Sequence, residues 1–178
     1  MRKALLLISA AVGAVVLLWH PAAAFGDGTV VRWKEIIGII QAGNIVGSGT
    51  GKVTGGLLPW HATGGNAVLN LTTGDLRFSV RGLVLAGGNP IGTRGDVAQI
   101  KGTLVCDTTG SANGNSTLVD SEFVPLSLTG NARFSGNVGP LPDACLNSPN
   151  IAFLIRTARG FWIADGSVRV LDGEDEDE

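Results

Sequence analysis

The chain has 178 residues, of which 44% are hydrophobic and 16% charged, and its formal net charge is -2. A chain of this length predicts one domain with its own core. The near balance of charge, without a run of basic residues, argues against nucleic acid as a partner. The 27 glycines and the absence of tyrosine favour many turns between short strands.

The first 24 residues predict a secretory signal peptide. A basic start, Met1-Arg2-Lys3, precedes an apolar run from Ala4 to Trp19 and then the small residues 22–24. That order is typical of an export signal, here a signal helix cleaved before Phe25. The apolar run is shorter than the roughly 20 residues that a membrane span needs. We therefore expect a secreted protein, extracellular or periplasmic, with no membrane span in the mature chain.

The first segments after the signal predict strands. Residues 29–34 (TVVRWK) alternate as a strand does, whereas residues 35–41 (EIIGIIQ) fit either a strand or a helix. Their β-branched content favours a strand. The glycine-rich residues 44–56 do not match a phosphate-binding GxxxxGK[ST] loop, because Val53 follows Lys52. We expect no cofactor.

The clearest structural signal is a β-hairpin over residues 66–85 (NAVLNLTTGDLRFSVRGLVL). In both arms apolar side chains alternate with polar ones, so one face of the hairpin is apolar and the other is polar and faces solvent. Gly74 in the connecting turn can adopt the positive φ that a tight turn or bulge requires. The apolar face needs a second layer to cover it.

The second half of the chain continues in the same manner. We expect a loop with an Arg94-Gly95-Asp96 turn, a strand over 97–106, an exposed polar loop over 107–116, a second hairpin formed by 122–128 and 131–138, and final strands over 151–155 and 161–170. Pro125 cannot donate a ladder hydrogen bond, so its strand is predicted at a sheet edge.

Eight to ten short strands with frequent turns predict an all-β fold for residues 25–171. We expect an antiparallel β-sandwich, with a small β-barrel as the alternative. Residues 172–178 contain six acidic side chains and predict a disordered tail.

Cys106 and Cys145 are the two cysteines of the chain, and in an exported protein such a pair predicts a disulfide. Two free buried thiols are the alternative. No metal site is expected, because there is no CxxC spacing and no histidine near either cysteine.

Trp60 and His61 are the candidate ligand-binding residues. Trp33 and Trp162 lie within predicted strands and are expected in the core, whereas Trp60 lies in a loop, where an exposed indole could stack on a sugar ring. His61 is the single histidine after the signal, and no GxSxG motif accompanies it, which argues against a Ser-His-Asp system. A pair of carboxylates could serve a glycosidase, and the candidates are Asp75, Asp96, Asp120, Glu122, Asp143 and Asp165.

The part of the chain from Cys106 to the end, with its runs LVC, VPLSLTGNARFSGNV, LPDAC and FWIADGSVRV, resembles small exported bacterial proteins of unassigned activity. The GDLRFSVRGL run is similar to the chordin-type secreted repeat, although the HIH run of that family is missing. Neither resemblance implies catalytic residues.

The sequence therefore predicts an exported, non-catalytic β-sandwich module with a structural or ligand-binding role. Its partner would be a glycan or another extracellular protein. The alternative is a carbohydrate-binding or carbohydrate-active protein.

Overall fold

The computed structural model describes residues 30–147 and 150–171, which form antiparallel strands and one short α-helix. The predicted signal peptide (1–24) and acidic tail (172–178) lie outside the described residues. The elements are β1 (Val30–Gly38), β2 (Ile45–Val46), the 3-10 helix η1 (Gly49–Gly51), β3 (Val53–Thr54), β4 (Trp60–His61), β5 (Gly64–Asn70), β6 (Asp75–Arg81), β7 (Val84–Leu85), β8 (Gln99–Cys106), β9 (Thr117–Asp120), β10 (Val124–Pro125), β11 (Ala132–Asn137), α1 (Asp143–Asn147), β12 (Ile151–Thr157) and β13 (Trp162–Leu171).

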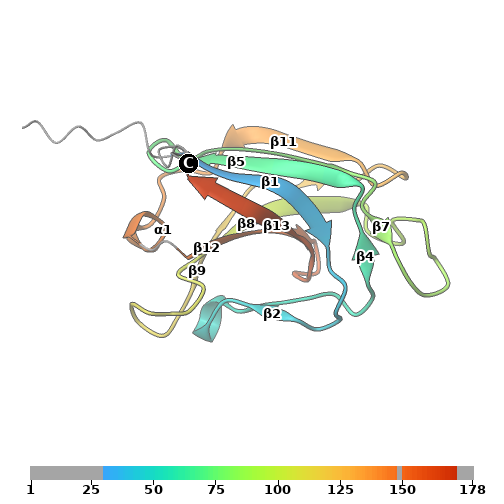
Figure 1. The fold of residues 1–178 in the computed structure, drawn as a ribbon, viewed down its shortest axis with the longest axis horizontal. Coiled ribbons are helices and arrows are strands. Elements are labelled where there is room, and N and C mark those ends of the chain that lie inside the picture. The colour runs from blue at the N-terminus through green and yellow to red at the C-terminus, as the bar shows by residue number, and fades with distance from the viewer. Residues whose placement is uncertain (1–29, 148–149, 172–178) are drawn as a thin grey trace, which may run out of the picture.

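Nine of these strands form one curled sheet (Figure 1). The strand order is β10-β8-β12-β13-β1-β5-β6-β11, and β9 pairs with β8 beside β10. Every ladder of the sheet is antiparallel, which confirms the predicted all-β, antiparallel class. β2 with β3, and β4 with β7, form two further pairs.

The predicted hairpin forms from β5 and β6, but it ends at Arg81, and residues 84–85 form β7, which pairs with β4 instead. Leu69 pairs with Leu76, and Gly74 in the turn has a φ of +74° and donates its N–H to the Asn70 carbonyl at 2.9 Å. Of the segment 35–41, which fits either a strand or a helix, residues 35–38 form a strand, because β1 continues to Gly38 and pairs there with β13, whereas residues 39–41 lie outside any strand.

The prediction that residues 122–128 and 131–138 form a second hairpin is wrong. β10 and β11 are joined by a tight turn, in which Ser127 N–H donates to the Asn131 carbonyl at 3.0 Å. Beyond the turn, however, β10 pairs with β8 and β11 pairs with β6, at opposite ends of the strand order. Because the sheet curls, its two end strands approach each other and the turn bridges them.

The core fills the inside of the curl. Four aromatic rings cross it in a chain, from Trp33 to Phe153 to Phe78 to Phe134, with successive centroids 5.5, 5.5 and 5.6 Å apart. Gly102 on β8 makes room for them, since a Cβ there would lie 2.8 Å from the Phe78 ring and 2.9 Å from the Phe153 ring. Trp33 and Trp162 are buried, as predicted.

The segment from β2 to β3 covers the outer side of the sheet. Just after β3 the chain is tied to β13, where Gly56 N–H donates to the Trp162 carbonyl at 2.9 Å. The segment is also tied to the 107–116 loop, where the Ser116 hydroxyl accepts from Ser48 N–H at 2.8 Å. The loop that the sequence predicts as exposed is therefore anchored through the buried Ser116.

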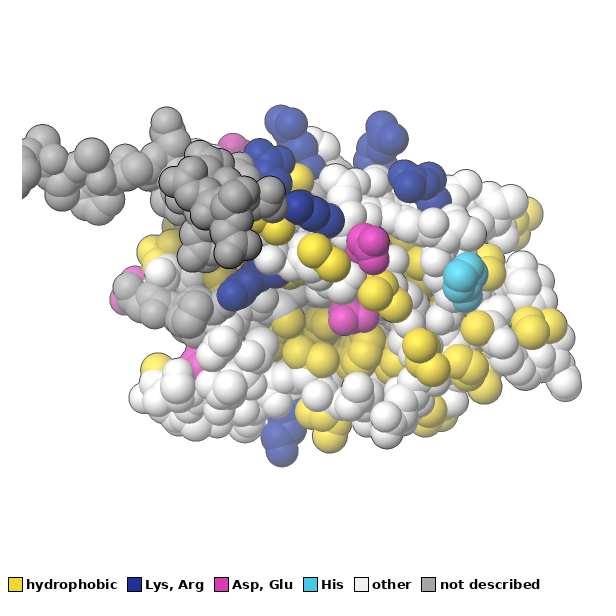
Figure 2. Space-filling model, viewed as in Figure 1, with side chains coloured by type: hydrophobic (Ala, Val, Ile, Leu, Met, Phe, Trp, Pro, Cys, Tyr) yellow, Lys and Arg dark blue, Asp and Glu magenta, His cyan; other side chains and the backbone are white. Residues whose placement is uncertain are grey.

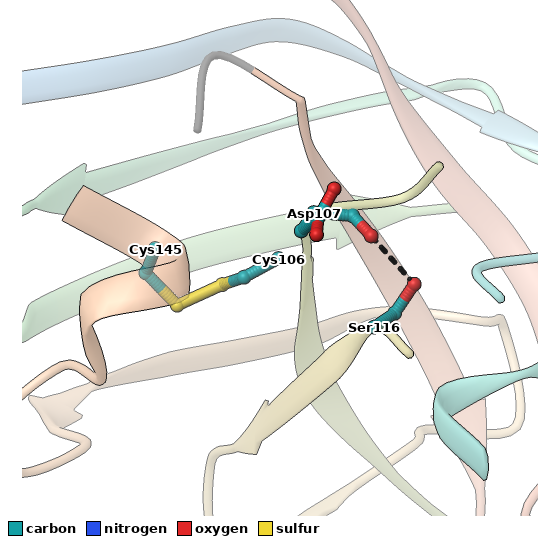
Figure 3. Close-up of a disulfide and its surroundings, with 4 residues drawn as sticks. All are labelled: Cys106, Asp107, Ser116 and Cys145. Carbon is teal, nitrogen blue, oxygen red and sulfur yellow. Dashed lines mark hydrogen bonds between the residues drawn. A yellow bond between two sulfur atoms is a disulfide. The ribbon is translucent and has the colours of Figure 1, made fainter. Parts of the chain in front are cut away.

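The predicted disulfide is confirmed. Cys106 at the end of β8 is bonded to Cys145 in α1, with their Cα atoms 4.8 Å apart and both residues fully buried (Figure 3). Next to it, the Ser116 hydroxyl donates to the Asp107 carbonyl at 2.8 Å. Hydrogen bonds from Ala112 and Ser111 to the Asp107 carboxylate lower the pKa of that group.

Candidate functional site

Trp60 is not exposed, contrary to the sequence prediction. Its side chain is 6% exposed, because β4 packs against the sheet and pairs with β7, which places Trp60 opposite Leu85. The backbone N–H of Trp60 donates to the Ile39 carbonyl at 2.7 Å. An indole in this position cannot present its face to a sugar ring.

His61 is exposed and lies at a hollow of about 460 Å³ beside the sheet. The hollow is also lined by Lys34 on β1 and Arg81 on β6. The structure therefore brings two cations and one carboxylate, Glu35, to the candidate residue His61.

These cations belong to a larger group, here called the basic face, which is the outward side of β1, β5, β6 and β11. Its cationic side chains are all exposed, and they are Arg32, Lys34, Arg77, Arg81 and Arg133. Figure 2 shows Lys and Arg side chains gathered along the side of the molecule where β1, β5 and β11 lie. Sequence reasoning missed this cluster because its members come from three strands that are far apart along the chain.

Strand register brings the basic side chains together. Arg77 and Arg81 lie on the same side of β6, with Ser79 between them. Arg133 on β11 pairs with Ser79, so it lies between the two β6 arginines, one strand spacing away. Arg32 lies in the row of Arg77, since Val68 of β5 pairs with both residues.

Two carboxylates lie at the margins of the basic face: Glu35, which lines the hollow with Lys34 and Arg81, and Asp75, the first residue of β6. Asn137 Nδ2 donates to Asp75 at 2.9 Å and the Thr73 hydroxyl at 2.7 Å. These hydrogen bonds, with a smaller contribution from the charge of Arg77, lower the pKa of Asp75. Asp75 therefore fastens the hairpin turn to β11, and the face around it keeps an excess of positive charge.

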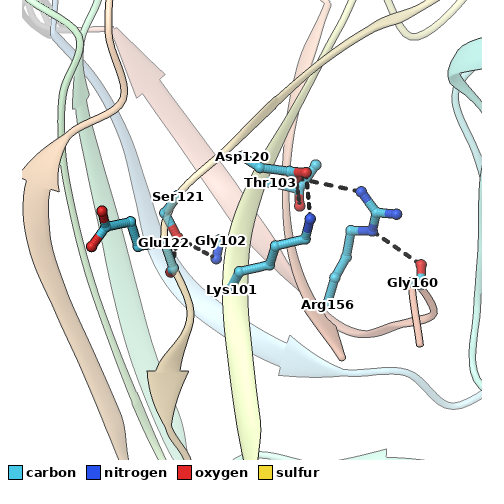
Figure 4. Close-up of polar contacts among 8 residues, drawn as sticks. All are labelled: Lys101, Gly102, Thr103, Asp120, Ser121, Glu122, Arg156 and Gly160. Carbon is cyan, nitrogen blue, oxygen red and sulfur yellow. Dashed lines mark hydrogen bonds and ion pairs between the residues drawn. The ribbon is translucent and has the colours of Figure 1, made fainter. Parts of the chain in front are cut away.

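Asp120 is the most highly bonded of the candidate catalytic carboxylates. It forms ion pairs with Lys101 and Arg156, and it accepts a hydrogen bond from the Thr103 hydroxyl at 2.5 Å (Figure 4). Glu122 comes from the same segment, but its carboxylate points away from Asp120 (Figure 4). The arrangement links β8, β9 and β12, and it does not form a pair of facing carboxylates.

Asp165 lies in the middle of β13, between Ile37 of β1 and Leu154 of β12. Its apolar surroundings raise its pKa, because burial disfavours the charged form.

A second concave region, here called the groove, lies at the β4–β7 end of the molecule and has a volume of about 440 Å³. Trp60 and Leu85 line it together with the 56–58 segment, the 94–99 segment and the turn after β12. Arg94, expected in a solvated turn, is half-buried there and donates from Nη1 to the Val97 carbonyl at 2.7 Å.

Across residues 30–147 and 150–171, no cluster of three or more His, Cys, Asp and Glu side chains could hold a metal ion. The described part of the chain also has no helix with the length and apolarity to cross a membrane. No protein-family model, curated protein or solved structure matches the chain.

Proposed function

We propose that this protein is an exported, non-catalytic binding module and that its ligand is an anionic polysaccharide held on the basic face. The supporting observation is the convergence of Arg77, Arg81 and Arg133 on one exposed side of two paired strands. Guanidinium groups form charge-assisted, bidentate hydrogen bonds with carboxylate and sulfate groups, which neutral sugars lack.

Neutral polar groups lie between the cations. Ser79 donates to the Asn66 side-chain oxygen at 2.8 Å, and Ser135 is exposed beside Arg77 on the next strand. Amide and hydroxyl groups of this kind can bond sugar hydroxyls while the arginines hold the acidic groups. The mixture fits a charged glycan better than a simple counter-ion.

A glycan is favoured over a nucleic acid because of the side chains on the face. Proteins that bind single-stranded DNA or RNA combine positive charge with exposed aromatic rings on which the bases stack. On β6 and β11, the aromatic residues Phe78 and Phe134 are buried in the core. The outward positions of these strands carry arginine, serine, asparagine and aspartate.

The proposal includes two further expectations from the sequence: that the protein is exported, and that its curled sheet is a β-sandwich. The disulfide supports an oxidising compartment, in keeping with the signal peptide expected in residues 1–24. In the sandwich description, β1, β5, β6 and β11 form one layer and β8, β12 and β13 the other, with the aromatic chain between them. The non-catalytic assignment is supported by Asp75 and Asp120, whose carboxylates are engaged in holding strands together.

The test is calorimetric titration of the protein with heparin and with polygalacturonate, at low and at high salt. Each charge-assisted bond contributes about 1.4 kcal/mol, which is a factor of ten in affinity. The variant Arg77→Gln/Arg133→Gln should therefore bind about 100-fold more weakly. Lys52→Gln is the matched control, because Lys52 is exposed and lies outside the basic face.

Three results would contradict the proposal. Equal losses in the double variant and in the Lys52→Gln control would show unspecific attraction. Single-stranded DNA binding as tightly as the polysaccharides would show a general polyanion site. Release of reducing ends from either polysaccharide would show a hydrolase, and Asp→Asn variants would then identify its carboxylates.

A further inference from the structure

The groove at the β4–β7 end combines a large apolar surface with a few polar groups. Its volume of about 440 Å³ lies in the range of small-molecule sites, which is about 300–1,000 Å³. Its floor is formed by the buried side chains of Trp60, Leu85 and Ile163. It shares none of the basic side chains of the basic face.

The walls of the groove carry apolar side chains that water surrounds in the free protein. Leu57 is 78% exposed, Leu58 40% and Phe161 38%, and all three line the groove. Exposed apolar side chains gathered around a concavity mark binding sites, because covering them is favourable. The groove therefore suits a ligand with an apolar body.

Charged groups at the groove favour an anion. Arg94 and Arg159 line it against a single carboxylate, Asp96. The hydrogen bond from Arg94 Nη1 to the Val97 carbonyl fixes the guanidinium group in the wall. Cationic side chains held in place in this way lose little conformational freedom when they bind a carboxylate.

Two polar atoms at the groove lack hydrogen-bond partners within the described chain. They are Arg94 Nε and the hydroxyl of Thr157, a residue that is 7% exposed. Native proteins satisfy nearly all buried polar atoms, and an unsatisfied one costs about 1–3 kcal/mol. Both atoms belong to residues that line the groove, although each atom is itself closed off from water, so they mark unmet hydrogen-bonding capacity in the groove wall rather than a direct ligand contact.

We propose that the groove binds a small amphipathic carboxylate. The apolar body of the ligand lies against Leu57, Leu58 and Phe161, and its carboxylate is held by Arg94 and Arg159. The groove site is independent of the proposed polysaccharide site, because the two ligands contact different side chains: the lining of the groove in one case and the basic face in the other. A protein that bound both ligands would do so without competition.

The test uses decanoate as the probe, below its micelle concentration, with binding followed by calorimetry and by the total tryptophan fluorescence, to which Trp60 on the groove floor contributes. Decanol and decyltrimethylammonium are the matched ligands, neutral and cationic. Loss of one charge-assisted bond corresponds to about tenfold in affinity. We expect decanoate to bind about tenfold more tightly than decanol, and decyltrimethylammonium to bind most weakly.

Arg94→Gln and Arg159→Gln should each lower the preference for decanoate over decanol, because both arginines hold the carboxylate. Arg159→Gln is the second variant, because Arg159 is exposed in a turn and its replacement does not disturb packing. Lys52→Gln is the control and should bind decanoate as the unmodified protein does.

Equal binding of decanoate and decanol would overturn the inference, as would unchanged selectivity in both arginine variants. Concentration-dependent dimerisation that Leu57→Ser abolishes would assign the groove to a second copy of the chain. Heparin competing with decanoate would also contradict an independent site. Failure of heparin to bind at all would refute the proposed function and leave the groove site untouched.

Discussion

Breaking the Cys106–Cys145 disulfide should lower the free energy of unfolding by about 4 kcal/mol. The two cysteines are 39 residues apart. In the chain-entropy description, a loop of this length removes roughly 13 cal/mol/K from the unfolded ensemble, or about 4 kcal/mol at 25 °C. A typical domain is stable by about 5–15 kcal/mol, so the loss is a large share of the total.

The assay is urea unfolding followed by the fluorescence of the buried tryptophans, Trp33, Trp60 and Trp162. With a slope of about 2 kcal/mol per molar urea, the unfolding midpoint should fall by about 2 M. Reduced wild-type protein and Cys106→Ala/Cys145→Ala are compared, because reduction keeps the sulfur atoms and isolates the cross-link from packing. An unchanged midpoint and slope on full reduction would refute the reasoning.

Three further changes test the fold. Gly102→Ala places a Cβ 2.8 Å from one phenylalanine ring and 2.9 Å from another, so it should cost about 1–3 kcal/mol in thermal unfolding, and a neutral result would contradict the packing. Asp165→Asn should stabilise the protein at pH 7 and have no effect at pH 3. The raised pKa of Asp165 means that the folded state loses stability as pH rises from the ordinary aspartate pKa through the raised one. Equal stabilisation at both pH values would exclude this cause. Asp120→Asn leaves Lys101 and Arg156 without their carboxylate and should cost up to about 1 kcal/mol, less at 1 M NaCl; a loss that salt does not reduce would argue against an ionic origin.

Local patterns in the sequence were sufficient to predict most of the longer strands, although β4 and β9 were not predicted. Alternation over residues 66–85 specified a hairpin whose two faces the structure confirms, because a strand repeats every two residues whatever its partners are. The β-branched residues of 35–41 likewise indicated a strand, which the structure contains as far as Gly38. The disulfide was predicted from the pair of cysteines together with the expected export signal.

The same local patterns could not predict which strands pair when those strands are far apart in the sequence. A short turn between two strands predicts a hairpin, yet Val124 and Ala132 pair with β8 and β6. The basic face was missed for the same reason. The wet side of β6, with Arg77 and Arg81, was visible in the sequence, but only the pairing of β11 with β6 places Arg133 between them. Trp60 was misjudged because a Pro/Gly-rich context gave no sign that β4 would pack on the sheet.

The described chain begins and ends in neighbouring strands, since Val31 of β1 pairs with Leu171 of β13. Figure 1 shows this point at one pole of the molecule and β4 and β7 at the other. Anything attached before or after the body therefore leaves from one pole. A tether at either terminus would hold the protein by that end, and the apolar groove at the β4–β7 end would then face away from the point of attachment.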